Sequence, residues 1–356
     1  MSKHLVVIPG DGIGPEITKA ALAVLLQAAQ QCGLDITYEE QYAGGAAIDY
    51  CGVPLPEATL AACGRAQAVL LGAVGGPKWD TVAPELRPEK AILGLRKALK
   101  LYANLRPVRV NAALAPYSPL KTELAEGVDI LIVRELNGGI YYGPRSEAQM
   151  KDGREEAWDT EIYSAPEVEK IVLVACQAAA QRRRRITSVD KANVLASSRL
   201  WRKTAASVAA RYPELELQHM YIDNCAMQLV LNPKGFDVLV TGNLFGDIIS
   251  DEAAVLAGSI GMLPSASLGD GPGLYEPIHG SAPDIAGQDI ANPLGTILSA
   301  AMLLRHSFDA PQAAARIEQA VDAVLADGYA TADLYRPGLK RVSTAAMGRL
   351  VQEKMR

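Results

Sequence analysis

The sequence predicts an α/β protein of two domains. Short runs rich in Val and Leu alternate with Ala-rich helical stretches, which is the rhythm of strand–helix units. The length of 356 residues is more than one small core holds, since domains typically span about 100–200 residues. Apolar residues make up 49% and charged residues 21%, as in ordinary soluble globular proteins. One large α/β unit is the alternative to two domains.

The individual elements follow from hydrophobic patterning. Buried strands are short continuous apolar runs, whereas helices repeat their apolar residues every three to four positions. We expect strands or extended segments over residues 5–8, 35–42, 68–71, 101–110, 129–134, 186–190, 216–221 and 237–240. We expect helices over residues 15–31, 90–100, 165–181, 197–211, 294–307, 312–326 and 344–354.

Two stretches depart from this rhythm. Residues 137–160 are rich in Gly, Tyr and charge, and the pairs at 138–139 and 143–144 are turn signals, so we expect a projecting hairpin or arm. Residues 258–293 form a long tract rich in Gly and Pro with few regular elements. Loops of that length are usually functional or disordered, and the apolar content of this one argues against a plain linker.

The charge balance and the cysteines narrow the class of protein. With 35 basic and 40 acidic residues the net charge is −5, which argues against a general nucleic-acid-binding surface. The five cysteines contain no CxxC motif and are expected to be reduced thiols. The N-terminal apolar run is too short for a signal peptide, and no run is long enough to span a bilayer. We therefore expect a soluble cytoplasmic protein with small-molecule or protein partners and no membrane.

The glycine-rich segment at residues 10–15, GDGIGP, lies between a predicted strand and a predicted helix. It resembles a dinucleotide-binding fingerprint, but Pro15 stands where the third glycine of GxGxxG would lie. Proline instead suits the first turn of a helix. We therefore favour a tight turn before a helix over a Rossmann fold.

Asp247 and Asp251 form the strongest candidate metal site. They lie at i and i+4 after a buried strand, so their carboxylates share one helix face about 6 Å apart. Asn243 is expected to cap the start of this helix. A divalent cation would remove their repulsion, and hard oxygen ligands suit Mg²⁺ or Mn²⁺. Asp223, at the end of another strand, is a candidate third ligand. The alternative is a solvated helix face with two unrelated acids.

Three arginines are candidates for binding an anionic substrate. Arg106 and Arg134 lie at or near the ends of apolar strands, and Arg96 lies on a predicted helix. An unpaired guanidinium is costly when buried, and guanidinium groups bind carboxylates in a bidentate manner. A dicarboxylate or tricarboxylate substrate would account for all three. The alternative, structural ion pairs with glutamates such as Glu135, has equal weight.

Lys191 and Tyr141 are candidates for proton transfer. Lys191 follows the end of a predicted strand, where burial or a nearby metal would lower the pKa of its amine towards neutrality. Tyr141 lies in the sequence GGIYYG, and a positioned phenol can deliver a proton to carbon. Taken singly, each residue is equally compatible with a packing or surface role.

Several segments together resemble the β-decarboxylating dehydrogenases, the family of isocitrate, homoisocitrate, tartrate and isopropylmalate dehydrogenases. The resemblance covers nearly the whole chain. Its most specific segments are 8–16 (IPGDGIGPE), 105–107 (LRP), 134–141 (RELNGGIY), 243–251 (NLFGDIISD) and 279–287 (HGSAPDIAG).

The resemblance implies a two-domain isopropylmalate/isocitrate dehydrogenase-like fold, distinct from the Rossmann type, with central mixed sheets, flanking helices and a protruding β arm. It implies a nucleotide-binding domain built from residues 1–99 and 253–356, and a middle domain of residues 100–252 with the dimer interface and the arm at about 137–160. It also implies a homodimer, with Lys191 and Asp223 reaching into the partner's site.

The implied activity is NAD-dependent oxidative decarboxylation of 3-isopropylmalate to 4-methyl-2-oxopentanoate and CO₂ in leucine biosynthesis. In this scheme the three arginines bind the substrate carboxylates, and the metal is held by Asp247, Asp251 and the partner's Asp223. Lys191 accepts the hydroxyl proton during hydride transfer to NAD, and Tyr141 protonates C3 after loss of CO₂. Asp223 thus contributes to both substrate and metal binding.

The resemblance also assigns residues for specificity. Ile92 and Leu93, with Val194 from the partner, correspond to the family's apolar pocket for the isopropyl group; the alternative is that they are core residues. The implied cofactor contacts are Gly76, Glu89, His279, Gly280, Ser281, Ala282, Asp284, Ile285 and Asn292. Segment 279–292 has no Lys or Arg, and Asp284 would repel a 2′-phosphate, which favours NAD over NADP.

Three alternatives to this activity remain. The first is the same chemistry on tartrate, malate or homoisocitrate. The second is a metal-dependent hydrolase or lyase that uses the Asp247/Asp251 pair without a nicotinamide cofactor, and the third is a binding module with an inactive site.

Overall fold

The computed structural model describes residues 2–356, and the chain divides into two compact units. Unit 1 comprises residues up to Leu101, the segment Val110–Gly127 and the C-terminal segment Ala254–Arg356. Unit 2 comprises Tyr102–Arg109 and Val128–Ala253. The segment Val110–Gly127 thus groups with unit 1, whereas the sequence analysis placed it in the middle domain.

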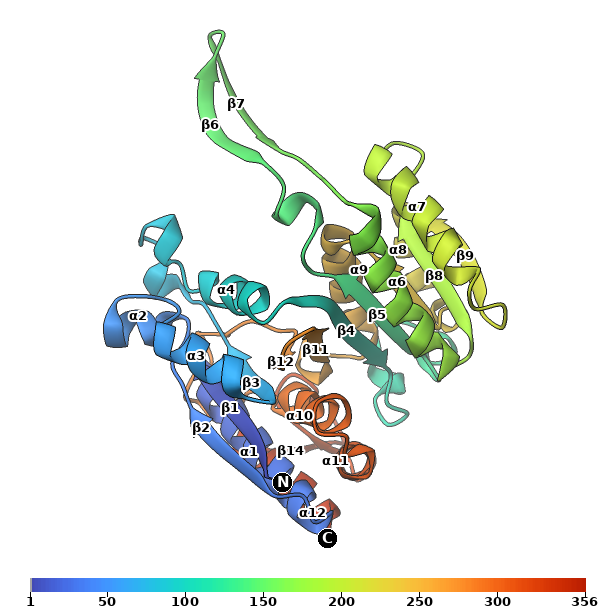
Figure 1. Cartoon of the computed structure of the whole chain (residues 1–356). Coiled ribbons are helices and arrows are strands. Elements are labelled where there is room, and N and C mark those ends of the chain that lie inside the picture. Colours follow the sequence, from blue (N-terminus) through green and yellow to red (C-terminus); the bar gives the residue numbers. More distant parts are fainter. Residues whose placement is uncertain (1) are drawn as a thin grey trace. The chain divides into compact units, whose positions relative to one another are not determined.

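Unit 1 is built on five strands in the order β2-β1-β3-β12-β11. The first four are parallel, and β11 runs antiparallel to β12. The strands are β1 (Lys3–Gly10), β2 (Ile36–Glu40), β3 (Ala68–Ala73), β11 (Pro264–Gly269) and β12 (Gly273–Pro277). Strands from both ends of the chain therefore lie side by side in one sheet (Figure 1).

Helices cover both faces of the unit 1 sheet. On one face α1 (Gly14–Gln31) and α10 (Leu294–His306) contact the strands, backed by α11 (Pro311–Ala326) and α12 (Thr344–Lys354). On the other face, buried side chains of α3 and α4 pack on β1 and β3. The helices on that side are α2 (Gly45–Cys51), α3 (Glu57–Arg65) and α4 (Lys90–Ala98). The apolar stripe of α1, which includes Ile17, Ala21 and Leu25, is buried because it faces the strands and α10.

Unit 2 is likewise built on five neighbouring strands, in the order β4-β5-β10-β8-β9. Only β4 is antiparallel to its neighbour; the other pairs are parallel. The strands are β4 (Leu101–Arg109), β5 (Asp129–Glu135), β8 (Arg185–Asp190), β9 (Glu216–Tyr221) and β10 (Val238–Thr241). The helices are α6 (Ala165–Ala180), α7 (Ala196–Ala209), α8 (Ile222–Leu231) and α9 (Asn243–Leu256), whose last residues fall in unit 1. Helix α6 begins with a capping box formed by Ser164 and Glu167.

A two-stranded arm extends from unit 2 (Figure 1). Its strands β6 (Arg145–Lys151) and β7 (Arg154–Asp159) pair with each other alone, and almost every side chain on them is exposed. Isolated hairpins of this kind have little stability in water. The arm therefore lacks a core of its own within one chain.

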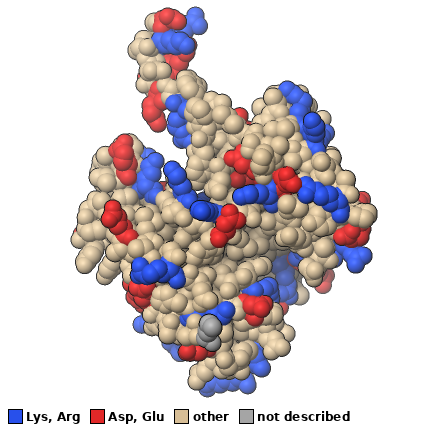
Figure 2. Space-filling model, in the orientation of Figure 1, with Lys and Arg blue, Asp and Glu red and all other residues tan. Residues whose placement is uncertain are grey.

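The α/β fold with mixed sheets, flanking helices and a protruding arm confirms the fold prediction. The helix starting at Gly14, with Pro15 in its first turn, also agrees with the tight-turn interpretation of the glycine-rich segment. Element boundaries differ by a few residues; the strand expected over 35–42 spans only Ile36–Glu40. On the face shown in Figure 2, basic and acidic residues are interspersed. No helix within residues 2–356 combines the length and the apolar character needed to cross a bilayer.

Candidate active site

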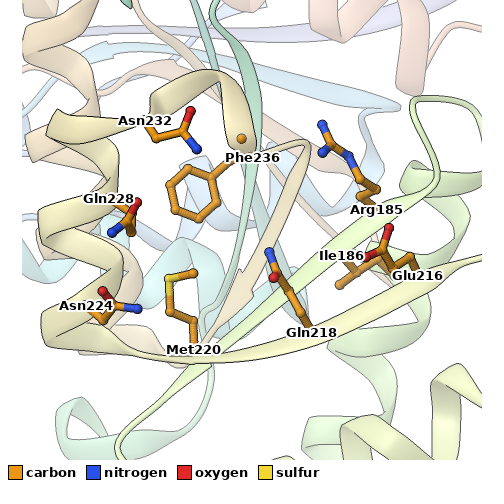
Figure 3. Close-up of a pocket in the computed structure, with 10 residues that line it drawn as sticks. Arg185, Ile186, Glu216, Gln218, Met220, Asn224, Gln228, Asn232 and Phe236 are labelled. Carbon is orange, nitrogen blue, oxygen red and sulfur yellow. The ribbon is translucent and has the colours of Figure 1, made fainter.

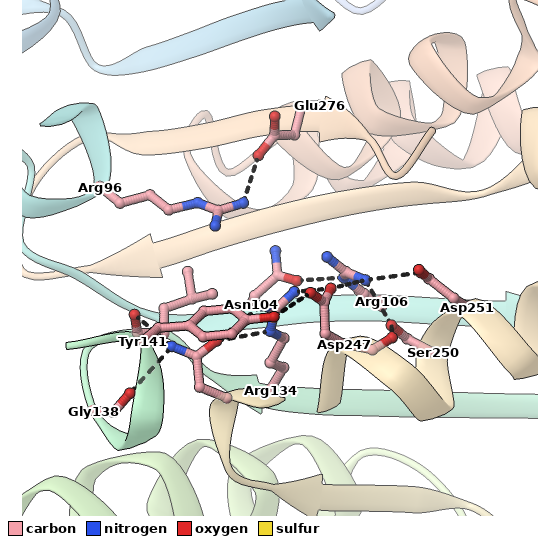
Figure 4. A network of polar contacts seen from close by, with 12 residues as sticks. Arg96, Asn104, Arg106, Arg134, Gly138, Tyr141, Asp247, Ser250, Asp251 and Glu276 are labelled. Atoms are coloured by element: carbon pink, nitrogen blue, oxygen red, sulfur yellow. Dashed lines mark hydrogen bonds and ion pairs between the residues drawn. The ribbon is translucent and has the colours of Figure 1, made fainter. Parts of the chain in front are cut away.

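The candidate site in unit 2 is a cluster of charged side chains from β4, β5 and α9. Arg106 comes from β4, Arg134 from β5, and Asp247 and Asp251 from α9 (Figure 4). Strand pairing places Asn104 of β4 opposite Arg134 of β5, so neighbouring strands present their polar residues at one place. All four charged residues were predicted from the sequence, and the structure brings them together.

Asp247 lies at the centre of this cluster. Its Oδ1 accepts a hydrogen bond from Nη1 of Arg134, and Nη1 of Arg106 is 3.3 Å away. Its Oδ2 accepts a hydrogen bond of 2.9 Å from the phenol of Tyr141. Burial, followed by the negative charge of Asp247, raises the pKa of Tyr141, which therefore keeps its proton. The phenol is a donor held against the same carboxylate that the arginines contact.

Arg106 is 7% exposed and makes polar contacts along its guanidinium. Its Nε donates to Oδ1 of Asn104 at 2.7 Å, and its Nη1 donates to Ser250 Oγ at 2.6 Å and to Asp251 at 3.4 Å. Burial raises the pKa of Asp251, while the charge of Arg106 lowers it. Asn104 and Ser250, which the sequence analysis did not single out, thus fix the direction of the guanidinium.

Asn243 was expected to cap a helix, and this expectation is wrong. Helix α9 begins at Asn243 itself, and the amide side chain turns to Arg134 instead. Its Oδ1 accepts hydrogen bonds from Nε and Nη2 of Arg134 at 3.1 and 2.8 Å. The side chain of a helix-start Asn usually bonds to the backbone of its own helix, so its sequence position alone suggested a cap.

Glu135 supports the turn that carries Tyr141. Its carboxylate accepts hydrogen bonds from the backbone N–H groups of Asn137 at 2.6 Å and Gly138 at 2.8 Å. The alternative of a structural ion pair for Glu135 is therefore replaced by a backbone-binding role. Burial raises the pKa of Glu135 from 4.5 to about 6, against the opposing effect of these N–H donors.

This raised pKa predicts how the stability depends on pH. Between pH 4.5 and 6 the folded chain binds the Glu135 proton more tightly than the unfolded chain, so stability from this group is lost as pH rises. The shift corresponds to a loss of about 2 kcal/mol at 1.36 kcal/mol per pH unit. Urea unfolding of wild type and Glu135→Gln at pH 4.5, 5.5 and 6.5 should show the variant gaining by this amount relative to wild type. A pH-independent difference between the two would contradict the assignment.

Lys191 and Asp223 form an ion pair in unit 2. Lys191 Nζ lies 2.8 Å from Asp223 Oδ1, with 62% of the Asp223 side chain exposed. The hydrogen bond from Lys191 lowers the pKa of Asp223. Val194 follows nearby in sequence and is 63% exposed. Lys191, Asp223 and Val194, which were predicted to contact the partner's site, are thus all at least partly exposed on this chain.

The donor chemistry of Asp247 and Asp251 fits a hard divalent cation. Both are carboxylates one helical turn apart, partly exposed at 32% and 58% of their side chains. Among residues 2–356, however, no three acidic, His or Cys side chains are grouped to hold a metal ion. Asp223 pairs with Lys191 of its own chain rather than joining the α9 pair. Asp247 and Asp251 thus offer two carboxylates to a cation.

Helix α4 in unit 1 carries the other predicted substrate residues. Ala91 and Leu95 face the core, Ile92 packs partly against it, and Leu93 is 37% exposed. Leu93 is therefore not a core residue, whereas Ile92 is partly one. Arg96 donates from Nη2 to Glu276 Oε1 at 3.1 Å, in a largely buried pair.

The glycine turn after β1 packs against the segment expected to bind the cofactor. Gly10 and Gly12 have φ values of +75° and +57°, and a Cβ on Gly12 would lie 2.0 Å from the carbonyl oxygen of Ser281. Ile13 donates its N–H to the same oxygen at 2.8 Å, and it packs with Ala282 and Ile285. The turn therefore shapes the 279–287 segment and does not itself form a Rossmann phosphate loop.

The predicted cofactor residues of this segment differ in their availability. Gly280 and Asp284 are exposed. His279 Nδ1 lies 2.9 Å from the carbonyl oxygen of Gly280, and burial lowers the pKa of this imidazole. Its buried Nε2 has no hydrogen-bond partner among residues 2–356. The side chain of Asn292, by contrast, is held by Asp333 at 3.0 Å and by the N–H of Leu294 at 2.9 Å.

A buried aspartate fixes the other predicted nucleotide loop. Asp11 accepts hydrogen bonds from the N–H groups of Gly45, Ala46 and Gly75 at 2.7–2.8 Å. Gly76 follows with φ +155°, and the carboxylate of Glu89 lies close to Gly75. Sequence analysis missed Asp11, although it lies inside the glycine motif.

Unit 2 also contains a cavity of about 300 Å³ between α8, β8 and β9 (Figure 3). Its lining is mainly amide and apolar side chains, including Gln218, Met220, Asn224, Gln228 and Phe236. None of the residues predicted for the reaction lines it.

Comparison with known proteins gives consistent matches over nearly the whole chain. The family model described as isocitrate/isopropylmalate dehydrogenase matches residues 4–351. A "3-isopropylmalate dehydrogenase" of Halalkalibacterium halodurans is 56% identical over 354 residues, which is 99% of this chain and 98% of that protein. The "3-isopropylmalate dehydrogenase 2, chloroplastic" of Arabidopsis thaliana is 56% identical over 97% of this chain and 85% of that protein.

Solved structures agree with this match. An isocitrate dehydrogenase from Methylococcus capsulatus has a TM-score of 0.89 at 36% identity, covering 99% of each chain. A β-decarboxylating dehydrogenase from Thermococcus kodakarensis has a TM-score of 0.82 at 37% identity, covering 99% of this chain and 96% of that one.

Proposed function

Because the chain belongs to the isocitrate/isopropylmalate dehydrogenase family, we propose that it oxidatively decarboxylates 3-isopropylmalate to 4-methyl-2-oxopentanoate and CO₂ with NAD, as a step of leucine biosynthesis. The observation that carries this proposal is the unit 2 cluster, in which two buried arginines converge with two aspartates and a tyrosine. The near-full-length identity to relatives named for this substrate supports the choice among 2-hydroxy acids.

The arginines are suited to binding a malate backbone. Arg106 and Arg134 are buried, so their charges act with little screening by water, and Asn104 and Asn243 hold their guanidinium planes. Substrate carboxylates would compete with Asp247 and Asp251 for Nη1 of each arginine. We assign Arg96 of unit 1 to the same substrate, with Glu276 as its present partner.

We assign the metal to Asp247 and Asp251 together with Asp223 of the partner subunit. When bound, Mg²⁺ or Mn²⁺ supplies Lewis-acid stabilisation of negative charge on the substrate oxygens, and NAD supplies the hydride acceptor. The carboxylate oxygens of Asp247 and Asp251 face the guanidinium of Arg106. The same carboxylates would therefore help to orient a substrate that binds this guanidinium.

The proton transfers are assigned to two residues. Lys191 takes the C2 hydroxyl proton while the hydride leaves C2. Tyr141 donates its phenolic proton to C3 once CO₂ has departed, because its hydroxyl is held by Asp247 and its raised pKa keeps it protonated. Asp247 thus orients a donor that acts only in the last step.

Specificity is assigned to exposed side chains. We assign the isopropyl contact to Leu93 on α4, which is exposed, together with Ile92 and the partner's Val194. An apolar wall penalises an additional substrate carboxylate, which would be desolvated without a partner. Asp284 is exposed and suited to the ribose hydroxyls of NAD, with no basic residue in 279–292 to accept a 2′-phosphate.

We further propose a homodimer with shared sites. Helices α8 and α9 expose apolar side chains on unit 2, namely Met227, Val230, Leu231 and Ile248. Such a surface is typical of a subunit interface. The coreless arm and the ion-paired Lys191 and Asp223 fit the same arrangement. The five free cysteines are consistent with a reducing compartment, and we place the enzyme in the cytoplasm.

An absorbance assay for NADH tests the proposal. We expect NADH to form from NAD only with 3-isopropylmalate and Mg²⁺ or Mn²⁺, and EDTA to abolish it; malate, tartrate, homoisocitrate and isocitrate should give turnover lower by about tenfold or more. Turnover that prefers one of these acids would replace the substrate. Cleavage without NADH would support the hydrolase or lyase alternative.

A further inference from the structure

We propose that Asn243 is a positioning residue that fixes, through one side-chain amide, both the Arg134 guanidinium and the turn that carries Tyr141. The inference rests on the proposed function, because it concerns the substrate-binding and proton-donating residues of that reaction. It assigns to Asn243 control over the side from which C3 receives its proton.

The amide of Asn243 uses its full hydrogen-bonding capacity. Oδ1 accepts two hydrogen bonds from Arg134, at 2.8 and 3.1 Å. Nδ2 donates to the carbonyl oxygens of Leu136 at 3.1 Å and Gly138 at 3.3 Å. An Asn side chain offers two donors and two acceptor lone pairs, so none is left for other groups. Asn243 is 2% exposed, and water therefore has little access to replace these bonds.

The two halves of the amide serve different residues. The oxygen binds Nε and Nη2 of Arg134, whose Nη1 contacts Asp247, and this sets the direction of the guanidinium. The nitrogen holds the carbonyl groups at the start of the turn, three to five residues before Tyr141. Figure 4 shows the Tyr141 ring beside Arg134, and the guanidinium carbon is 5.8 Å from the ring centroid.

The backbone of Asn243 strengthens this placement. Its N–H donates to the hydroxyl of Tyr163 at 2.8 Å, and Tyr163 in turn interacts with Glu135. Glu135 binds the N–H groups of Asn137 and Gly138. The turn is therefore held on its carbonyl side by Asn243 and on its N–H side by Glu135.

The chemical consequence appears in the last step. When the C3–CO₂ bond breaks, its electron pair remains with C3 and C2, and the Tyr141 O–H bond then breaks as a new C3–H bond forms. The phenolate recovers a proton from solvent. In D₂O the exchanged phenol delivers deuterium to one face, so the product carries one deuterium at C3 in a single configuration. A displaced Tyr141 lets solvent protonate either face.

The variant Asn243→Asp separates the two halves of the amide. It retains an oxygen acceptor for Arg134 but places an oxygen opposite the carbonyl groups of Leu136 and Gly138, which are then left without a donor. We expect the Arg134 contact to persist and KM for 3-isopropylmalate to rise, because the added carboxylate competes with the substrate for this guanidinium. We expect deuterium at C3 in both configurations, determined by NMR on product reduced as it forms.

Asn243→Ser is the second variant, and Asn232→Asp is the control. Serine reaches neither Arg134 nor the carbonyl groups, so KM should rise about tenfold or more and the deuterium should again be scrambled. Asn232→Asp makes the same chemical change on an exposed residue and should keep wild-type KM and one configuration.

Folding of each variant is checked by circular dichroism. Folded Asn243 variants that keep wild-type KM and a single configuration at C3 would overturn the inference. If wild type itself forms no NADH from 3-isopropylmalate, the proposed function fails and the role of Asn243 is judged by the thermal midpoint alone: a loss in Asn243→Ser no larger than in Asn232→Asp would then reject it.

Discussion

Replacing Lys191 by Ala is expected to reduce NADH formation by about 10²- to 10⁴-fold, the usual contribution of a general base. The chain should still fold, because Asp223, the partner that loses its ion pair, has 62% of its side chain exposed to water. Tyr141→Phe should instead spare the hydride step and impair protonation at C3. Pre-steady-state NADH absorbance separates the two, since a burst should persist in Tyr141→Phe. Equal loss of the burst in both variants would contradict the assigned roles.

The same variant tests whether the site is shared between subunits. Lys191→Ala and Asp247→Asn are each expected to be inactive. After mixing and re-association, half of the dimers contain one chain of each kind, and one of their two sites has both residues intact. Activity should then return to about a quarter of wild type, as the pairing of two chains in a symmetric dimer dictates. No recovery in verified mixed dimers would place Lys191 in the site of its own chain.

Replacing Arg134 by Met is expected to destabilise the fold by about 1–3 kcal/mol, because buried acceptors lose their donor while Arg106 and Tyr141 still contact the Asp247 carboxylate. Only 3% of the Arg134 side chain is exposed, against 32% for Asp247. Asn243 also loses two donors to its Oδ1. The measurement is urea unfolding at pH 7, with kcat/KM for 3-isopropylmalate determined on the fraction that remains folded.

Arg211→Met is the matched control for this loss. Arg211 pairs with Glu169 on the surface, where both side chains are about half exposed. Such pairs contribute about 0–1 kcal/mol, so the control should unfold nearly as wild type does. A similar loss of unfolding free energy in both variants would show that the burial of Arg134 does not make its contacts more stabilising.

Much of the site could be predicted because its residues follow local rules. The i, i+4 spacing put Asp247 and Asp251 on one face of α9, and the arginines at strand ends implied buried charges in need of partners. The structure adds the partners themselves. Arg134 meets Asp247 through the pairing of β5 with β10, which no local pattern specifies.

Most of the residues that were missed act through contacts distant in sequence. Ser250 orients Arg106 from 144 positions away and Tyr163 supports Asn243 from 80 positions away, whereas Asn104 lies only two positions from Arg106. Asn243 was noticed, but helix-start statistics predicted a cap and concealed its link to Arg134. Likewise Asp11 lies inside a motif that was recognised, while its three N–H partners come from the start of α2 and from the loop after β3.

The strands of the fold were also predictable from local patterns, whereas their order in the sheet was not. Continuous apolar runs identified most strands, yet nothing local showed that β12, from the last third of the chain, would lie beside β3. The domain boundaries and the cofactor contacts stay predictions, since they depend on such long-range placement or on ligands.

Unit 2 lies between segments of unit 1 along the sequence, and this order has a consequence for folding during synthesis on the ribosome. The residues of unit 2 are nearly continuous in sequence, so its strands can all pair once residues up to about 253 have emerged. The N-terminal strands of unit 1 must wait for β12, α10 and α12 at the far end of the chain. Until then, β3 has an open edge and α1 an uncovered apolar stripe, which makes the nascent chain a natural client of chaperones.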